Sequence, residues 1–378
     1  MYRRSSLFIA LFSILFASTF GQQPALEGAF QSLIEEQEII GLAVVAVKDG
    51  RIVYKHNFGM QNREQNIPLN ERSIFRIASI SKSFSAVTIM QLMEDGKVSL
   101  DDDFSKLVGF TVRNPNYPDK IITLRMIMSH TSSVNDSQGY TNLDFINPAK
   151  NPNYAKCYSS FAPGEKYDYC NLNYNMVGAV IERLTGERFD MRIKNHILKP
   201  LGLYGGYCVD SLDASRFTVL YACDSATGKY IPSTDAYAPR REQLATYQLG
   251  YSTPVLSPTG GMKISAEDLC KYMMMHMNNG TSNGIKIMSS KHAQLMRTKI
   301  TDDESYGLAM RESSDLIPGE VLKGHTGTAY GLYSAMFFEP KKKFGFVVIV
   351  SGCRPQEEID IKLVLRKSMK ILYDHIIK

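Results

Sequence analysis

A serine and a lysine that could act together lie three residues apart in the stretch RIASISKSFS, residues 76–85. If this stretch is helical, Ser79 and Lys82 lie on one face, one turn apart. An ammonium group beside a hydroxyl favours the alkoxide that forms during nucleophilic attack, and a partly neutral lysine can instead take the proton. The alternative is a helix-capping serine with a solvated lysine. These four residues alone do not decide between the two interpretations.

The hydrophobic pattern around this stretch predicts an amphipathic helix at residues 79–95 that Gly96 ends. β-rich runs meet at Asp49–Gly50 and again at residues 340–343, and each pair of runs predicts a hairpin. Between about residues 100 and 240, Pro, Asn, Tyr and Gly punctuate short helices. Strands near both ends with helices between them indicate one sheet built from both ends, around a helical insertion.

Two later stretches carry further polar groups in a suggestive order. Tyr169-Cys170-Asn171 lies in KYDYCNLNYN, and His325-Thr326-Gly327 opens GHTGTAYG at the start of a predicted strand. A third stretch, GTSNG at residues 280–284, matches the letters of a G-x-S-x-G nucleophile turn. It follows a Met-rich helix and lacks the strand–turn–helix context of that motif, so we interpret it as a loop.

Together these residues form an ordered triplet, S-x-x-K, Y-x-N and H-T-G. With this triplet the sequence resembles the class C β-lactamase and DD-peptidase family of penicillin-recognising serine hydrolases, and SHTSSV, KPLGL and PTGGMKISAEDL extend the resemblance. It implies an α+β, β-lactamase/transpeptidase-like fold, with an antiparallel sheet flanked by helices and an inserted, mostly helical region. The expected organisation is a signal peptide at 1–21, a sheet domain at 22–100 and 241–378, and the insertion at 101–240.

The resemblance also implies roles for single residues. Ser79 would be the acylated nucleophile, and Lys82 would lie between Ser79 and Tyr169 and hold the phenol partly ionised. Tyr169 would then take the Ser79 proton and return it to the leaving group. Asn171 would hold the amide of the substrate. In an extended segment alternate side chains share a face, so Cys170 would point away from the site.

The H-T-G motif, at the start of a predicted strand, would line the other side of the site. His325, Thr326 and Gly327 would form the pocket wall, and the Thr328 amide would be an oxyanion donor beside the Ser79 amide. Many β-lactamases of the family carry lysine at the position of His325, and a mostly neutral histidine attracts a substrate carboxylate less strongly. The chain also departs from the family at Ser133, where glycine is usual.

The implied activity is that of a secreted serine hydrolase that cleaves a small amide or ester through an acyl-enzyme. The substrate would be a β-lactam, a D-Ala-D-Ala-like peptide or a short ester, because one scaffold serves many substrates. Two alternatives are an acyltransferase that passes the acyl group to a small alcohol or amine, and a penicillin-binding sensor that deacylates slowly.

Composition limits the remaining possibilities. The net charge of +5 has no basic stripe behind it, so we expect no nucleic-acid partner. Arg3 and Arg4 precede an apolar run at residues 7–20 and then small or polar residues, the order of a secretory signal. A retained anchor is the alternative. We therefore expect a secreted or periplasmic protein with no stable membrane insertion after cleavage.

Six cysteines fit up to three disulfides in an oxidising compartment. Cys208 and Cys223, which flank an expected hairpin, are the pair we favour; scattered thiols are the alternative. No C-x-x-C pair or histidine cluster is present in the sequence, so we predict no metal site and no cofactor. The oligomeric state is left open.

Overall fold

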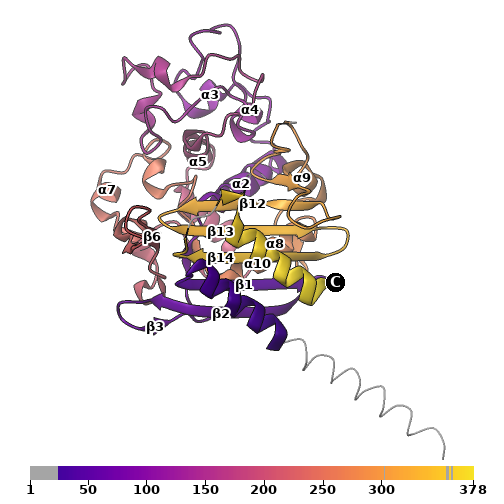
Figure 1. Cartoon of the computed structure of the whole chain (residues 1–378). Helices are drawn as coiled ribbons and strands as arrows, with labels where there is room; N and C mark the ends of the chain where they lie inside the picture. Colours follow the sequence, from indigo (N-terminus) through magenta and orange to yellow (C-terminus); the bar gives the residue numbers. More distant parts are fainter. Residues whose placement is uncertain (1–23, 302, 355–356, 359–360) are drawn as a thin grey trace, which may run out of the picture.

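A seven-stranded antiparallel sheet forms the centre of the molecule (Figure 1). The computed structural model describes residues 24–301, 303–354, 357–358 and 361–378. The strand order is β11-β12-β13-β14-β1-β2-β3, so strands from the two ends of the chain pair with each other. The bounds of these strands are β1 (Gly41–Lys48), β2 (Arg51–Asn62), β3 (Ile67–Pro68), β11 (Arg311–Ser313), β12 (Leu322–Ala329), β13 (Leu332–Glu339) and β14 (Phe344–Ser351). The predicted sheet built from both ends is confirmed.

Two tight hairpins set the register of the central strands. Asp49 and Gly50 have φ angles of 52° and 70°, which is the backbone conformation that a two-residue turn between β1 and β2 requires. The second hairpin joins β13 and β14, which begin to pair at Glu339 and Phe344. Both hairpins lie where the sequence predicts them.

Helices cover both faces of the sheet, and for this reason its central strands carry apolar residues on both sides. Leu42, Val44 and Ala46 of β1 pack in one apolar cluster, and Ala43 and Val45 pack in the other. Burial of a side chain of the size of valine or leucine contributes about 1.5–3 kcal/mol to folding. The covering helices are residues 24–37 and α10 (Leu363–Leu372) on the first face, and α2 (Lys82–Glu94) and α8 (Ala266–Met277) on the second.

The remaining elements fall into two groups. A largely helical part lies beyond the β12 side of the sheet, where Figure 1 shows α3, α4 and α5. Smaller elements lie around the sheet. The other helices are α3 (Phe104–Val108), α4 (Leu124–Met128), α5 (Asn171–Thr185), α6 (Phe189–Ile193), α7 (Arg241–Ala245) and α9 (Ser290–Met296). The short strands are β4 (Phe75–Arg76), β5 (Gly205–Gly206), β6 (Tyr221–Cys223), β7 (Tyr230–Pro232), β8 (Lys263–Ile264), β9 (Thr281–Ser282), β10 (Ile285–Lys286), β15 (Glu357–Glu358) and β16 (Ile361–Lys362). The division into 22–100, 101–240 and 241–378 stays a prediction.

A buried carboxylate holds the loop that follows α7 against this helical part. Glu182 of α5 accepts hydrogen bonds from the Gly250 amide at 2.7 Å and the Thr253 hydroxyl at 2.8 Å. It also accepts one from the Phe189 amide at 2.8 Å, at the start of α6. Since a buried charge is costly without such partners, we infer that these bonds fix the loop in one position.

The cysteine pairing that we favoured is wrong. All six cysteines are free thiols, and five of them are buried. Cys223 is the last residue of β6, and the β6–β7 hairpin spans residues 221–232, so it does not lie between Cys208 and Cys223. Between the two cysteines the chain forms 3₁₀ turns at Val209–Ser211 and Ala214–Arg216, so the hairpin that we expected there is wrong.

The predicted signal peptide at residues 1–21 lies outside the described residues. Within the described part, none of the helices has the length and apolar character needed to cross a membrane. The described residues also contain no group of three or more His, Cys, Asp and Glu side chains placed to hold a metal ion.

Candidate active site

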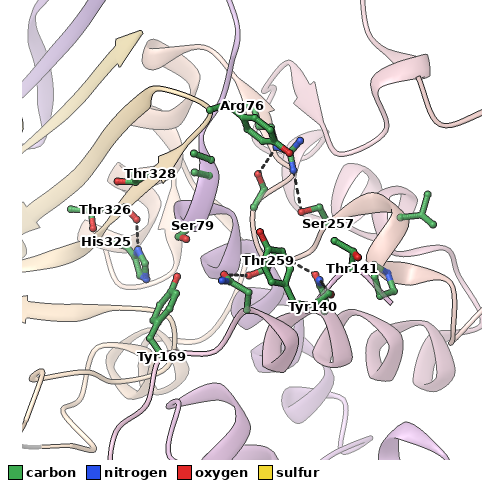
Figure 2. Close-up of a pocket in the computed structure, with 18 of the residues that line it drawn as sticks. Arg76, Ser79, Tyr140, Thr141, Tyr169, Ser257, Thr259, His325, Thr326 and Thr328 are labelled. Carbon is green, nitrogen blue, oxygen red and sulfur yellow. Dashed lines mark hydrogen bonds between the residues drawn. The ribbon is translucent and has the colours of Figure 1, made fainter. Parts of the chain in front are cut away.

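The candidate nucleophile lies in a short 3₁₀ turn, η1 (Ala78–Ser81), between β4 and α2. The helix that was predicted from residue 79 therefore begins three residues later, at Lys82. Ala78 has a φ of 50°, a conformation that few residues other than glycine adopt. The turn presents Ser79 to a cavity, and Figure 2 shows its hydroxyl near the centre of the lining residues.

The Lys82 ammonium group lies beside the Ser79 hydroxyl, as predicted. Its Nζ is 3.1 Å from Ser79 Oγ, 2.9 Å from Asn171 Oδ1 and 3.0 Å from the Thr259 carbonyl oxygen. These three contacts fix the position of the nitrogen. The side chain has no exposed surface. Burial lowers the pKa of Lys82 to about 7, although the Asp136 carboxylate acts in the opposite direction. Both protonation states of Lys82 are therefore populated at neutral pH.

Tyr169 also faces the Ser79 hydroxyl. Its phenol is hydrogen-bonded to Ser79 and points toward it in Figure 2. Lys82 Nζ lies 4.7 Å from the centre of the Tyr169 ring. About a third of the residue surface, 36%, is open to the cavity. Burial of the rest raises the pKa of Tyr169 well above its usual value, and the hydrogen bond from Ser79 opposes this only in part.

The raised pKa of Tyr169 does not favour the partly ionised phenol that the resemblance implied. An ionised phenol would need a cation to stabilise it. Lys82 supplies less charge than assumed, because burial lowers its own pKa. The two shifts favour a protonated Tyr169 and a partly neutral Lys82, and the catalytic roles of both residues stay predictions.

Asn171 lies at the start of α5, and both ends of its side-chain amide have protein partners. Oδ1 accepts from Lys82 and, at 2.8 Å, from the Thr259 hydroxyl, and Nδ2 donates to Asp136 at 3.0 Å. Asp136 also accepts the backbone N–H groups of Asn171 and Leu172, which places its charge at the N-terminus of the helix. Asn171 therefore positions Lys82, and its expected contact with a substrate amide stays a prediction.

Strand β12 forms the wall opposite α5, as expected. His325, Thr326 and Thr328 line the cavity. Ala329 pairs with Leu332 across a two-residue turn, so Thr328 and its partner Tyr333 form a pair that exchanges no backbone hydrogen bonds. The Thr328 N–H consequently points away from β13, as an oxyanion donor beside Ser79 must.

Gly327 allows β12 to lie against the nucleophile turn. A Cβ atom at this position would come within 2.3 Å of the Ile77 carbonyl oxygen and 3.2 Å of the Ala78 Cβ. Both neighbours belong to the segment that carries Ser79. The short distance between β12 and the segment that carries Ser79 therefore requires a residue without a side chain at position 327.

Gly327→Ala is expected to lower kcat/KM for an aryl ester about 100-fold, because the strand must move away from Ser79. Steady-state hydrolysis measures this effect. Thermal unfolding should show a loss of about 1–3 kcal/mol. Gly28→Ala is the matched control, because a Cβ at Gly28 meets nothing within 4 Å. Full activity of Gly327→Ala would contradict the role given to this close approach.

His325 is held neutral, as expected for a histidine at this position. Burial lowers its pKa to about 3, and Lys82 acts in the same direction. Its Nε2 lies 3.1 Å from the Tyr306 hydroxyl, and its Nδ1 contacts the Thr326 carbonyl oxygen. His325 therefore adds no positive charge to this end of the cavity, and both of its ring nitrogens already have protein partners.

A second buried histidine, which the sequence analysis did not select, supports Tyr169. His130 Nδ1 accepts the Cys170 amide at 3.2 Å, and its ring centre lies 4.4 Å from that of Tyr169. Burial lowers the pKa of His130 well below its usual value, so the ring packs as a neutral group. The only sequence signal was the SHTSS segment itself. Within that segment Ser133 has a φ of 61°, which fits the glycine usual at this position.

The rate is expected to follow the protonation of Lys82. With its pKa near 7, kcat/KM for a neutral ester should be about tenfold lower at pH 6 than on a plateau above pH 8. The sign is fixed because only the neutral amine can accept the Ser79 proton. The pKa of His325 lies near 3, so that residue does not titrate in this range. A rate independent of pH between 5.5 and 8.5 would rule out this role for Lys82.

The geometry agrees with the comparison to known protein families. The family described as Beta-lactamase matches residues 26–367, which is most of the chain. The chain belongs to the Beta-lactamase family. Members of this family are serine hydrolases. This is the class of enzyme that the resemblance implied from the motifs that contain Ser79, Lys82 and Tyr169.

Relatives and solved structures agree with this assignment. Protein flp of Staphylococcus aureus (strain NCTC 8325 / PS 47) is 24% identical over 334 residues, 84% of this chain and 61% of that protein. The chain thus spans less than two thirds of the length of this relative. Esterase EstB of Burkholderia gladioli is 28% identical over 212 residues, 52% of this chain and 54% of EstB.

Among solved structures, the octameric penicillin-binding protein homologue from Pyrococcus abyssi superposes with a TM-score of 0.73. It is 25% identical, and the match covers 92% of this chain and 76% of that one. EstCE1, described as a hydrolase with promiscuous acyltransferase activity, superposes with a TM-score of 0.71 at 20% identity, over 95% of this chain and all of EstCE1. These likenesses confirm the β-lactamase/transpeptidase-like fold.

Proposed function

We propose that this protein hydrolyses a small amide or ester through an acyl-enzyme on Ser79. One observation carries the proposal: Ser79 Oγ lies 3.1 Å from Lys82 Nζ, a buried amine whose pKa is about 7, at the edge of a cavity of about 790 Å³. A hydroxyl beside such an amine can lose its proton while it attacks a carbonyl carbon. The cavity has the size of a small-molecule site.

The proton path follows from the two shifted pKa values. Neutral Lys82 takes the Ser79 proton as Oγ bonds to the carbonyl carbon, and the Ser79 and Thr328 amides receive the oxyanion. Tyr169, which is protonated, donates to the leaving group as the bond to it breaks, and Lys82 returns a proton to the phenolate. Water then attacks the acyl-enzyme with the same groups in reverse order.

The proposed substrate class covers short esters, D-Ala-D-Ala-like peptides and β-lactams. Because His325 is neutral, it attracts a substrate carboxylate more weakly than a lysine at this position would. We therefore rank esters and peptides ahead of penicillins. The relative EstB is named as an esterase. For this reason an ester is the first substrate to test on the present protein.

Transfer of the acyl group to an alcohol or amine is the second candidate function. The cavity of about 790 Å³ is in the upper part of the range of about 300–1,000 Å³ for small-molecule sites. A short ester leaves space in it for an acceptor. A sensor that deacylates slowly remains the non-hydrolytic alternative.

The test measures product formation from 4-nitrophenyl acetate, a D-alanyl-D-alanine peptide and a reporter penicillin, with and without methanol as acceptor. Steady turnover in water supports a hydrolase, and turnover that rises with methanol, with methyl acetate as product, supports transfer. A single burst without turnover supports the sensor. If none of the three substrates reacts faster than in buffer, the proposed function is wrong.

We also propose that the protein is exported, either secreted or periplasmic. The support is the order of basic, apolar and small polar residues in the first 23 positions. Expression of the full chain with cell fractionation tests this. A cytoplasmic protein with an intact N-terminus would contradict it, whereas an intact N-terminus in the membrane fraction would indicate the retained anchor.

A further inference from the structure

A buried guanidinium group faces the catalytic cavity without an acidic partner among the described residues. Arg76 is only 9% exposed, yet it lines the cavity. It donates to the carbonyl oxygens of Gly260 and Ala236 and to the hydroxyl of Ser257, at 3.1, 3.2 and 3.3 Å. The Tyr330 ring lies 4.8 Å from its carbon Cζ. All of these partners are neutral, and one N–H on each terminal nitrogen has no described protein acceptor.

Two more basic side chains lie close to Arg76. Arg240 lines the same cavity, and within the described part of the chain its side chain donates one hydrogen bond, to the neutral Gln243 at 3.4 Å. Lys263 is 3% exposed and donates to the Tyr207 carbonyl oxygen at 2.6 Å. Burial lowers the pKa of Arg76, and the charge of Arg240 adds to this. Burial lowers the pKa of Lys263 well below its usual value, so the positive charge at this end of the cavity comes from Arg76 and Arg240, which line it.

Two acidic groups near these basic side chains, Asp190 and Asp210, are paired with other bases. Asp190 binds Arg188 through both carboxylate oxygens, at 2.6 and 2.9 Å. Asp210 accepts from Arg241 at 3.1 Å and from the backbone amide of Arg240 at 2.8 Å. Neither carboxylate lines the cavity. A negative charge on a bound molecule could therefore compensate the positive charge of Arg76 and Arg240 at the cavity surface.

The opposite end of the cavity is electrically balanced. There Arg311 lies 3.4 Å from Glu304, and His325 is neutral. Figure 2 shows Arg76 and Ser257 on the far side of Ser79 from His325. An anionic group on a bound molecule would therefore gain most by lying toward Arg76, where two guanidinium groups meet it with little competing charge.

We propose that the substrate of Ser79 carries a carboxylate that binds between Arg76 and Arg240, on the side of the cavity away from His325. The inference rests on the proposed function and names its substrate class more narrowly: amides or esters with one free carboxylate. Arg76 would supply its two remaining N–H groups. Arg240 would supply charge and a second donor from the rim.

The test compares matched esters that differ only in charge. For the acyl half, 4-nitrophenyl hydrogen adipate is compared with the corresponding terminal amide, and for the leaving group, 4-carboxyphenyl acetate is compared with 4-carbamoylphenyl acetate. We expect kcat/KM to favour the anionic member of one pair by about tenfold or more at low salt. The preference should shrink at high ionic strength, because salt screens the partly exposed Arg240. The pair that shows the preference identifies the half of the substrate that carries the carboxylate.

Arg240→Gln should remove most of that preference, measured as the ratio of the two kcat/KM values within the pair. Arg241→Gln is the matched control, because Arg241 is the adjacent arginine, is largely exposed and pairs with Asp210 outside the cavity. It should keep the preference. The inference is overturned if neither pair favours the anion, or if Arg240→Gln leaves the preference intact. Failure of the proposed function is distinct from this, because the neutral esters would then not react either.

Discussion

Ser79→Ala is expected to lower kcat/KM for 4-nitrophenyl acetate by about 10⁵- to 10⁶-fold, because the atom that bonds to the acyl carbon is gone. The fold should survive the change. Lys82 keeps its contacts to Asn171 and Thr259, at 2.9 and 3.0 Å, so the buried amine is not left unpaired. Steady-state rates and thermal unfolding of the same preparation measure both effects.

Ser282→Ala is the control for this experiment. Ser282 is the serine of GTSNG, which matches the pattern G-x-S-x-G. It lies in the short β9–β10 hairpin and does not line the cavity. It should keep wild-type activity. If Ser79→Ala retained more than about one hundredth of the wild-type rate, Ser79 could not be the residue that carries the acyl group.

Lys82→Met is expected to lower kcat/KM by about 10³- to 10⁴-fold, because methionine fills the same buried space but accepts no proton. The residual activity should lose its dependence on pH near 7, since Lys82 is the group whose pKa lies there. A pH series of kcat/KM on the variant measures both changes. Retention of a tenth of the activity would contradict the assignment of the base.

Lys82→Arg separates the two roles that a lysine can play beside a serine. Arginine keeps a positive charge at all relevant pH values and does not give up its proton. If Lys82 acts only as a cation, Lys82→Arg should recover part of the activity lost in Lys82→Met. If it acts as the base, as proposed here, the arginine variant should be as inactive as the methionine variant.

The local features were predictable from the sequence because they depend on residues close together in the chain. The hairpin at Asp49–Gly50 follows from turn chemistry, and the proximity of Ser79 to Lys82 follows from their spacing of three residues. Bringing Tyr169 and His325 to the same cavity needs contacts between distant elements, which periodicity does not encode. Only the family resemblance supplied that step.

Other features of the site depend on burial and could not be predicted. Thr259 lies in the stretch PTGGMKISAEDL, but nothing in that stretch indicates that its carbonyl oxygen binds Lys82 Nζ, at 3.0 Å. The protonation of Tyr169 and Lys82 depends on how completely each is surrounded, and the sequence states only the residue types. For the same reason the partners of Arg76, which are all neutral, became visible only in the fold.

The most direct test of the central claim is to locate the acyl group itself. The purified protein is mixed with 4-nitrophenyl acetate, quenched in acid within the first turnover and analysed by intact mass and peptide mapping. The expected result is one acetyl group, on Ser79, that decays at the rate of turnover and is absent from Ser79→Ala. Turnover without an adduct, or an acetyl group on another residue that decays at the rate of turnover, would contradict an acyl-enzyme on Ser79.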